Sequence, residues 1–381
     1  MGFRSIRVYN YRNLHNAEID TAAPEVFLVG ENGQGKSNFL EAVYVLCYAS
    51  SFRTRTDALL MRHGSSETAL SGSVTETENP TNDPHVASVD PQAGTSLARC
   101  TERRIIWRDG KKRVIVDGRD VEDRKELIRS LPCIVFCHDD IQFVRGAPDM
   151  QRYFFDQTLS LDDPLFIDTL RDYRRIVRLR NSALKEYRTE LLPAYDRQLA
   201  QTGLEIQLRR REAVAAFSAT FCDLYQGISG SEDKLVIEYR PSWKSDPPLE
   251  KVIALLEDRR QTDLAIGTTT SGPHRDRFRF AMNGSDYTDT ASTGQLRLTS
   301  LVLRVAQARF FSDRAGRRPL LLLDDVMLEL DPVRRARFLA VLPAYDQAFF
   351  TFLPDEQFNS YRKDATLLYR VVAGVIDGES G

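Results

Sequence analysis

The architecture of this protein follows from one segment, Val26-Phe27-Leu28-Val29-Gly30-Glu31-Asn32-Gly33-Gln34-Gly35-Lys36-Ser37. It reads as a buried strand followed by a glycine-rich turn, and Phe39, Leu40 and Val43 then predict a helix from Asn38 onward. A strand, a turn of this type and a helix, in this order, form a phosphate-binding loop. We therefore expect residues 30–37 to bind the phosphates of a nucleotide.

Each residue type in the loop has a chemical reason. Glycine lets backbone N–H groups converge on a polyphosphate, because a Cβ would block the approach or the positive φ values that it requires. The helix N-terminus adds partial positive charge. Lys36 is predicted to reach the β- and γ-phosphates of the nucleotide, and the Ser37 hydroxyl to coordinate Mg²⁺. The predicted nucleotide contacts are Gly30, Glu31, Asn32, Gly33, Gln34, Gly35, Lys36 and Ser37.

A second set of groups lies far downstream. The run Leu320-Leu321-Leu322-Leu323 ends in Asp324 and Asp325, as a central parallel strand does when its carboxyl end faces a ligand. We expect Asp324 to hold Mg²⁺ together with Ser37, and Asp325 to orient or activate the attacking water. A strand that ends in a solvated turn is the alternative interpretation.

Between these two regions lies Ser292-Thr293-Gly294-Gln295, directly before a helical pattern of apolar residues. The serine hydroxyl, the glycine N–H and the helix N-terminus could form a second phosphate-binding end. One γ-phosphate seldom needs two such ends in a single chain, so we expect this loop to cap the nucleotide of another copy. A simple helix cap would have the same sequence.

Length, charge and composition limit the classes of protein to which this chain could belong. With 381 residues and a net charge of −2, the chain is long enough for two domains, and any nucleic-acid binding needs a local basic face. No apolar run of membrane-spanning length and no signal-peptide core are present, so we expect no membrane and a cytoplasmic location. The five cysteines lack C-x-x-C spacing, which favours reduced thiols.

The pattern along the chain alternates between strands and helices. Residues 3–20 predict a two-strand meander, and Asp109-Gly110 and Asp117-Gly118 predict hairpin turns. A polar, proline-rich segment near residues 74–96 reads as a flexible surface insertion. From about 162 to 225 the period becomes helical, with a break at Leu192-Pro193 and an end at residues 227–230, which predicts two long antiparallel helices.

A basic helical face is the candidate for DNA contact. Arg171, Arg174, Arg175 and Arg178 fall on one side of the first long helix, and Arg180, Lys185, Arg209, Arg210 and Arg211 extend the series. The functional interpretation is a groove that binds phosphates without reading sequence, centred on Arg174, Arg175 and Arg178. The alternative is a solvated face in an arginine-rich chain. For His274 we favour a structural role over a role in the site.

Further motifs occur across nearly the whole chain. They are Asn10-Tyr11-Arg12-Asn13-Leu14, Asn38-Phe39-Leu40-Glu41-Ala42, Ser51-Phe52-Arg53-Thr54, Gly146-Ala147-Pro148, Arg152, Phe155-Asp156, Arg180-Asn181-Ser182-Ala183-Leu184-Lys185, Ser271-Gly272-Pro273-His274-Arg275-Asp276, Ser292-x-Gly294-Gln295-x-Arg297, Leu323-Asp324-Asp325 and Glu329-Leu330-Asp331. With these motifs in this order, the chain resembles the SMC-like branch of the ABC-type ATPases and, within it, the RecF family of bacterial recombination mediators.

The resemblance implies a fold and a division of the chain. The fold class is α/β, an ABC-type (SMC-like) P-loop ATPase head with an inserted antiparallel helical arm. Residues 1–160 would form the N-terminal part of the head, 161–231 the arm or lever, and 232–381 the C-terminal part with the signature loop and the carboxylate strand. Arg12 would be an additional phosphate contact, Ser292, Gly294 and Gln295 would act in trans, and Asp331 would belong to the loop at the dimer interface.

The resemblance also implies a function in recombinational DNA repair and replication restart. Such a protein binds single-stranded or gapped DNA, forms a homodimer on ATP, hydrolyses ATP slowly as an ATP-switched clamp, works with RecR and RecO, helps to load RecA and supports SOS induction. This sequence departs from the pattern in places. Thr351 stands where transporter-type heads carry a switch histidine, so that device is not expected. Asp139-Asp140 stands where a metal-contacting glutamine would lie.

Three other classes compete with this interpretation. An ATPase subunit of a membrane transporter is disfavoured by the missing histidine, the long inserted helices and the wide separation of the motifs. A small-molecule kinase would need a lid and a substrate pocket, and has no use for the Ser292 loop. A GTPase is disfavoured because no Asn-Lys-x-Asp motif appears in the sequence.

Overall fold

The structure is a computed structural model that describes residues 1–76, 99–244 and 246–378. The chain divides into two compact units, which we describe separately. Residues 1–137, 318–328 and 344–381 form the first, here the phosphate-loop unit. Residues 138–317 and 329–343 form the second, here the helical unit. The phosphate-loop unit therefore combines an N-terminal segment with two C-terminal segments that lie far from it in the sequence.

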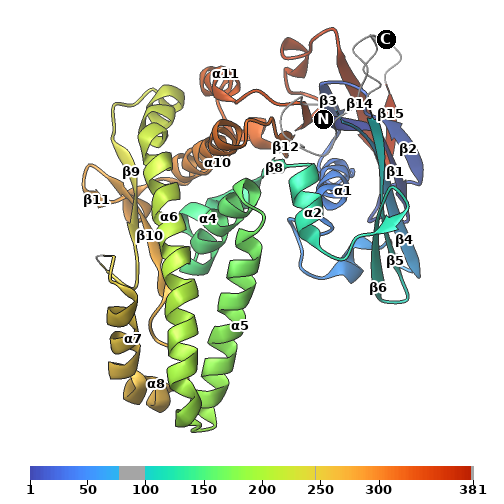
Figure 1. Ribbon diagram of the computed structural model, residues 1–381. Helices are drawn as coiled ribbons and strands as arrows, with labels where there is room; N and C mark the ends of the chain where they lie inside the picture. The colour runs from blue at the N-terminus through green and yellow to red at the C-terminus, as the bar shows by residue number, and fades with distance from the viewer. Residues whose placement is uncertain (77–98, 245, 379–381) are drawn as a thin grey trace, which may run out of the picture. The chain divides into compact units, whose positions relative to one another are not determined.

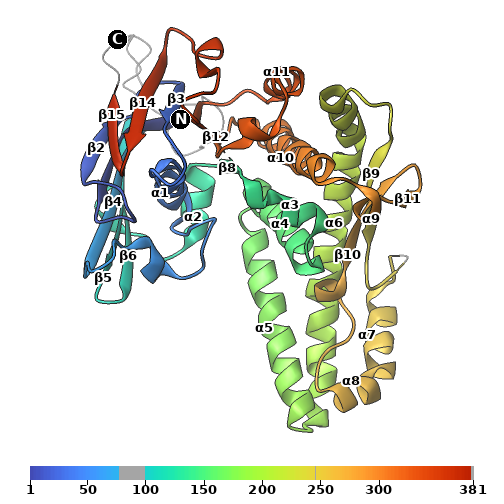
Figure 2. The ribbon, with the colours of Figure 1, turned by 180° about the vertical axis from the view of Figure 1, so that it is seen from behind.

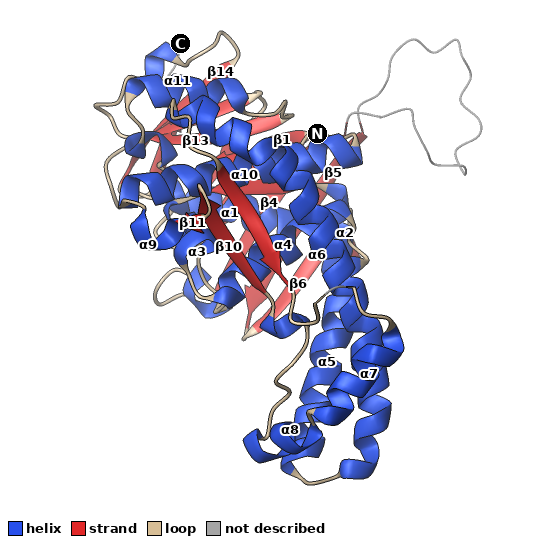
Figure 3. Cartoon of the chain, turned by 90° about the vertical axis from the view of Figure 1, so that its left-hand side faces the viewer, coloured by secondary structure: helices blue, strands red, loops and turns tan. Residues whose placement is uncertain are grey.

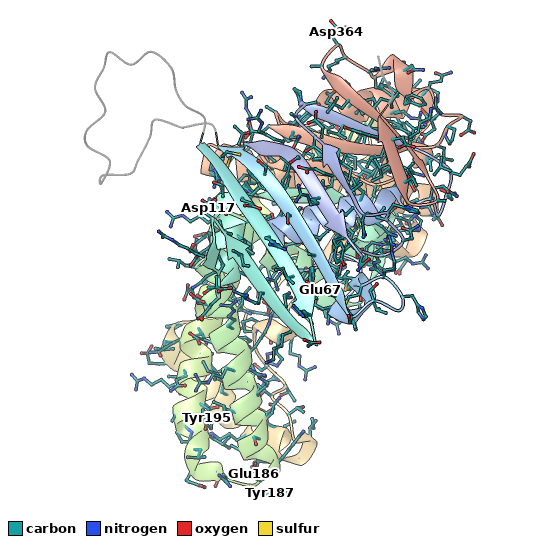
Figure 4. All side chains as sticks on the ribbon, turned by 90° about the vertical axis from the view of Figure 1, so that its right-hand side faces the viewer. Glu67, Asp117, Glu186, Tyr187, Tyr195 and Asp364 are labelled. Carbon is teal, nitrogen blue, oxygen red and sulfur yellow. The ribbon has the colours of Figure 1, made fainter. Side chains whose placement is uncertain are left out.

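One sheet of the phosphate-loop unit is antiparallel throughout. Its order is β2-β1-β4-β5-β6-β7, with β1 at Gly2–Tyr9, β2 at Ala17–Asp20, β4 at Glu67–Glu76, β5 at Arg99–Arg108, β6 at Lys111–Val116 and β7 at Arg119–Asp120. Figure 4 shows this sheet face-on, with Glu67 near one end and Asp117 near the other. The predicted meander and both hairpins are confirmed: Asp109 and Gly110 have φ of 51° and 71°, and Asp117 and Gly118 have φ of 49° and 77°.

The second sheet is mostly parallel and carries the phosphate loop. Its order is β15-β14-β3-β13-β12-β8, with β3 at Glu25–Val29, β8 at Cys133–Phe136, β12 at Leu320–Leu323, β13 at Gln347–Phe352, β14 at Thr366–Val372 and β15 at Val375–Gly378. Only β15 is antiparallel among these strands. β3, β8, β12 and β13 are buried along their whole length, as continuous apolar runs predict.

Helix α1, at Lys36–Tyr48, packs between the two sheets of this unit (Figure 1). It contacts β4 and β5 of the antiparallel sheet and β8 and β13 of the parallel sheet. This explains why nearly every residue of α1 is buried rather than one face only. Helix α2, at Arg124–Ser130, packs on α1, and a short 3-10 turn spans Asp57–Leu60.

The helical unit is built around α6, at Leu192–Ser229 (Figure 3). This helix contacts α4 at Pro148–Asp162, α5 at Phe166–Lys185, α7 at Leu249–Asp258, α10 at Thr293–Ala315, α11 at Pro332–Val341 and β9 at Leu235–Arg240. The unit also contains α3 at Ile141–Arg145, α8 at Arg260–Ile266, α9 at Tyr287–Thr290, β10 at Arg277–Met282 and β11 at Ser285–Asp286 (Figure 2). The strands form a sheet in the order β11-β10-β9.

The two long helices predicted from the sequence are confirmed as α5 and α6. Pro193 stands in the first turn of α6, where its missing N–H costs nothing, and Gly230 ends the helix with φ 74°. Glu186 and Tyr187 lie at the end of the arm that α5 and α6 form (Figure 4). The antiparallel arm therefore has the breaks that its sequence predicts.

A cluster of aromatic side chains lies in the core of the helical unit. Rings from α4, α6, β10 and α10 meet pairwise with centroids 4.1–6.0 Å apart, and they belong to Phe154, Phe155, Phe217, Phe278 and Phe310. Aromatic pairs at these separations add to the free energy gained by burying the rings. Through Phe310, this cluster packs the C-terminal part of α10 against α6.

Two sequence predictions need comment. The predicted start of the insertion, near residue 74, is too early, because β4 continues to Glu76 and pairs with β5. The rest of the predicted insertion falls within residues 77–98, which lie outside the described part of the chain. The division at residues 160 and 231 stays a prediction. No helix within residues 1–76, 99–244 and 246–378 is both long and apolar enough to cross a membrane.

Candidate nucleotide-binding site

The phosphate loop connects β3 to α1, and its glycines stand where the backbone needs them. Gly33 and Gly35 have φ of 78° and 122°, which side chains rarely adopt. A Cβ on Gly30 would lie 2.3 Å from the carbonyl oxygen of Val371 on β14. Strand packing therefore requires glycine at residue 30, and backbone conformation requires it at 33 and 35.

Lys36 is the first residue of α1 and is 3 % exposed. Its Nζ donates hydrogen bonds to the carbonyl oxygens of Gly30, at 2.6 Å, and Glu31, at 3.1 Å. The same Nζ lies 4.0 Å from Oδ1 of Asp325. A buried ammonium is thus held by the loop itself, within reach of the carboxylates that end β12.

Ser37 and Asp324 meet although 287 residues separate them in sequence. The Ser37 hydroxyl donates to Oδ1 of Asp324 over 2.7 Å. Burial raises the pKa of Asp324 to about 6, the neighbouring carboxylate of Asp325 adds to this rise, and the Ser37 hydrogen bond and the Arg53 charge oppose it. A half-buried carboxylate beside a hydroxyl is an oxygen donor pair that suits Mg²⁺. A cation would offset the cost of removing this charge from water.

Thr351 on β13 contacts both carboxylate residues. Its Oγ1 accepts a hydrogen bond from the Asp325 N–H over 2.7 Å, and lies 2.9 Å from Oδ1 of Asp325 and 3.3 Å from Oδ1 of Asp324. Asp325 itself has φ 53°, in the left-handed region. Sequence reasoning noted Thr351 only for the histidine that it replaces and did not find this contact.

Arg12 was expected to contact phosphate, and the structure places its guanidinium on Glu41 of α1. Nε and Nη2 donate to the two carboxylate oxygens over 2.8 and 2.7 Å, and Glu41 is fully buried. This hydrogen-bonded pair raises the pKa of Arg12. The neighbouring residue Asn13 contacts the loop directly, since its Nδ2 donates to the Gly33 carbonyl over 3.3 Å. A phosphate contact by Arg12 stays a prediction.

The turn between β14 and β15 packs on the phosphate loop. The N–H of Gly374 donates to the Gln34 carbonyl over 2.8 Å, and the N–H of Ala373 donates to Oε1 of Gln34 over 2.5 Å. Gly374 has φ 84°, and a Cβ there would lie 2.0 Å from the Asn13 carbonyl oxygen. This turn therefore buttresses the loop from a distant part of the chain, and no sequence motif indicated it.

We expect Gly374→Ala to weaken nucleotide binding at least tenfold and to destabilise the fold by about 2 kcal/mol or more, because the backbone at Asn13 must move. Thermal unfolding and titration with a fluorescent ATP analogue would measure both effects. Gly118→Ala is the matched control: it also lies in a hairpin turn, with φ 77°, but a Cβ there meets nothing within 4 Å. Equal effects of the two substitutions would contradict the buttress.

The Ser292 loop and Asp331 belong to the helical unit. Ser292 caps α10: its Oγ accepts from the Gln295 N–H over 3.2 Å, while Oε1 of Gln295 accepts from the Ser292 N–H over 2.9 Å. Asp331 similarly caps α11 through the Arg334 N–H, over 2.9 Å. A Cβ on Gly294 would meet nothing within 4 Å, so no contact with the described residues requires glycine there. The capping interpretation holds within the chain, and the role of this loop in trans stays a prediction.

The prediction of a basic helical face was partly wrong. Arg174, Arg175 and Arg178 are exposed on α5 and make no ion pair within the described residues, whereas Arg171 pairs with Asp168 over 3.4 Å. Two arginines of the series are buried: Arg180 against Asp196 and Asp263, and Arg210 against Asp156 and Asp276. Two others form ion pairs, Arg209 with Asp163 and Arg211 with Asp246. Lys185, the last residue of α5, is exposed. The candidate patch keeps Arg174, Arg175 and Arg178 as its centre.

The surroundings of His274 fit the structural role that we favoured for this residue. Nδ1 lies 2.7 Å from the Tyr173 hydroxyl, and Nε2 lies 3.0 Å from the Thr269 carbonyl oxygen. Burial lowers the pKa of the imidazole. Both ring nitrogens thus have partners inside the helical unit, which fits a neutral histidine that ties α5 to the segment before β10.

The chain is similar to known proteins over nearly its whole length. The sequence profile described as "RecF/RecN/SMC N terminal domain" matches residues 3–374. A "DNA replication and repair protein RecF" of Treponema pallidum is 41% identical over 365 residues, which is 96% of this chain and 98% of that protein.

This chain belongs to the RecF family.

A RecF protein of Rippkaea orientalis is 31% identical, with 99% of each chain covered. Among solved structures, "Structure of the recombination mediator protein RecF-ATP in RecFOR pathway" has a TM-score of 0.85 and 26% identity, covering 99% of this chain and 97% of that one. The fold-class prediction is confirmed: the chain is α/β, with the SMC-like ABC-type head of the RecF family and an inserted antiparallel helical arm.

Proposed function

We propose that this protein binds ATP and acts in DNA replication and repair, as an ATP-switched DNA-binding protein of recombinational repair and replication restart. The observation that carries the proposal is the 2.7 Å hydrogen bond between Ser37 of the phosphate loop and Asp324 at the end of β12. Membership of the RecF family and the solved RecF–ATP structure that the chain resembles support it.

The part of the site formed by one chain consists of residues 30–37, Asp324 and Asp325, and the position of each residue suggests its role. Residues 30–37 would bind the phosphates through the N–H groups and glycines of the loop, and Lys36 would move its ammonium from loop carbonyls to phosphate oxygens. Ser37 and Asp324 would hold Mg²⁺, which supplies charge stabilisation of the phosphates when it is bound. Asp325, 32 % exposed, would orient the attacking water.

The other half of the site would come from a second copy of the chain. Ser292, Gly294 and Gln295 would present the N-terminus of α10, a 23-residue helix, to the γ-phosphate, and Asp331 would line the same interface. The open surroundings of Gly294 support a contact outside the chain. ATP would then close a homodimer, and slow hydrolysis would reopen it.

DNA and protein partners complete the proposal. The chain would bind single-stranded or gapped DNA, cooperate with RecO and RecR, help to load RecA and support SOS induction, in the cytoplasm. The similar solved structure, described as RecF-ATP in the "RecFOR pathway", supports RecO and RecR as partners. A transporter subunit would instead need a membrane partner, and a small-molecule kinase would transfer phosphate to a substrate.

The deciding experiment measures binding to gapped, single-stranded and duplex DNA, with and without ATP, over a salt series. We expect ATP to increase affinity, with a preference for gapped or single-stranded DNA and a steep fall with salt. Lys36→Ala is the control that should abolish the ATP effect. Salt-insensitive binding, or affinity that is the same with and without ATP, would overturn the proposal.

Within this assay, we expect replacement of Arg174, Arg175 and Arg178 by alanine to weaken binding to all DNAs alike and to reduce the slope of log affinity against log salt by roughly three, about one per lost phosphate contact. Arg171→Ala is the matched control, because Arg171 lies on the same helix and pairs with Asp168. An unchanged slope in the triple variant would remove this patch from the DNA-binding surface.

A further inference from the structure

Thr351 occupies a central position in the parallel sheet. It lies on β13, which is hydrogen-bonded on one side to β3, the strand before the phosphate loop, and on the other to β12, the strand before Asp324. Its backbone pairs with Leu28, and the residue is 1 % exposed. One strand thus places a hydroxyl between the strand that leads into the phosphate loop and the strand that ends at Asp324.

The Thr351 hydroxyl has one proton and can donate it to only one of the two neighbouring carboxylates. It accepts from the Asp325 N–H over 2.7 Å, so its single proton is free for a carboxylate oxygen. Oδ1 of Asp325 lies at 2.9 Å and Oδ1 of Asp324 at 3.3 Å, so the shorter contact goes to Asp325. One side chain therefore holds both the backbone and the carboxylate of the same residue.

Asp325 needs such support. Its φ of 53° is a conformation that a residue other than glycine keeps only where its surroundings enforce it. Its Oδ1 faces Thr351 and, at 4.0 Å, Nζ of Lys36, whereas its Oδ2 has no hydrogen-bond partner in the described part of the chain. The contacts to Oδ1 turn the carboxylate so that Oδ2 is the oxygen available to a water.

We propose that Thr351 is a positioning residue for ATP hydrolysis, which fixes the left-handed backbone of Asp325 and aims its carboxylate. The inference rests on the proposed function, in which Asp325 orients the attacking water. Thr351 needs no contact with the nucleotide for this role. It acts through Asp325, so removing its hydroxyl affects turnover and leaves the phosphate loop and Lys36 in place.

The test compares Thr351→Val, which keeps the shape and loses the hydroxyl, with Thr351→Ser, which keeps the hydroxyl. We expect Thr351→Val to lower kcat roughly tenfold or more, with KM and the affinity for a non-hydrolysable ATP analogue changed less than about threefold. Thr351→Ser should stay within about threefold of the parent. If the serine variant is as slow as the valine variant, or if affinity falls together with kcat, the residue fills space and the proposal is wrong.

A second substitution shows whether Thr351 acts through Asp325. In an Asp325→Asn background, Thr351→Val should lower the remaining hydrolysis by less than about twofold, because effects on one functional unit are not additive. A further full tenfold loss there would mean that the two residues act independently, and would overturn the inference.

A readout without nucleotide separates this inference from the proposed function. Hydrogen exchange of the Asp325 amide should be roughly tenfold or more faster in Thr351→Val than in the parent and Thr351→Ser, since the hydroxyl is its hydrogen-bond acceptor. Equal exchange in the three proteins would overturn the positioning role. A parent protein that binds no ATP would instead overturn the proposed function, and with it the part of the inference that concerns hydrolysis.

Discussion

A mixture of Lys36→Ala and Ser292→Arg chains is expected to hydrolyse ATP, although each variant alone is inactive. A heterodimer contains one complete site, formed by the intact phosphate loop of the Ser292→Arg chain and the intact Ser292 loop of the Lys36→Ala chain. With random pairing, half of the dimers are mixed and each has one working site, so about a quarter of the parent rate should return. ATP turnover at constant total protein measures this.

The two substitutions fail for different reasons. Lys36→Ala removes the buried ammonium that holds the carbonyls of Gly30 and Glu31, so we expect ATP affinity to fall roughly hundredfold or more. Ser292→Arg leaves the phosphate-loop unit unchanged, so ATP should still bind to it. It places a bulky cation at the N-terminus of α10, so dimer closure and hydrolysis should be lost.

Controls separate an effect in trans from an effect on the cap. A chain with both substitutions, mixed with Lys36→Ala, contains no complete site and must stay inactive. Ser292→Asn keeps a capping oxygen for α10, so its stability should match the parent while hydrolysis falls. If Ser292→Asn hydrolyses ATP at the parent rate, the loop is only a cap; if the first mixture stays inactive, the composite site is wrong.

The second large effect concerns stability. We expect Asp324→Asn to stabilise the nucleotide-free protein at neutral pH by on the order of 2–3 kcal/mol and to abolish Mg²⁺-dependent hydrolysis. The pKa of Asp324 is about 6 against an ordinary value of 3.8. Between these values the folded chain holds a proton that the unfolded chain has released, so the free energy of unfolding falls as pH rises. Asparagine carries no charge and removes that fall.

Thermal or urea unfolding of both proteins at several pH values between 3.5 and 8, without nucleotide or Mg²⁺, would check this. The advantage of Asp324→Asn should be small below about pH 4, grow up to about pH 6 and then stay constant. Asp364→Asn is the control, since that carboxylate is exposed. An advantage that does not depend on pH, or a loss of stability at pH 7.5, would show that the buried charge is not the cause.

Local patterns predicted much of this fold. The strand–turn–helix order around residues 30–37, the two Asp-Gly hairpins and the helices α5 and α6 each depend on residues close in sequence, and all are confirmed. The buried arginines were misassigned because burial depends on partners from elsewhere: Asp263 lies 83 residues from Arg180, and Asp276 lies 66 residues from Arg210. A helical face alone cannot show which arginines find such carboxylates.

Residues of the candidate site could be predicted where their chemical type alone suggests a role. They could not be predicted where the role depends on a contact with a distant part of the chain. Lysine, serine and paired aspartates signal phosphate and metal chemistry by their identity. Gly374 and Thr351 are ordinary residues whose roles come from close approach: a Cβ on the first would meet the Asn13 carbonyl at 2.0 Å, and the second reaches Asp325 across neighbouring strands. Neither contact has a local sequence signal.

The arrangement of the parallel sheet has a consequence for the newly made protein. The strand that carries the phosphate loop, β3 at Glu25–Val29, has β13 and β14 as its neighbours, and β13 begins only at Gln347. At about 5–20 residues per second, roughly a quarter of a minute to a minute passes on the ribosome before β3 can pair. Residues 138–317 emerge during this interval. A nascent chain therefore acquires its arm before it can hold a nucleotide.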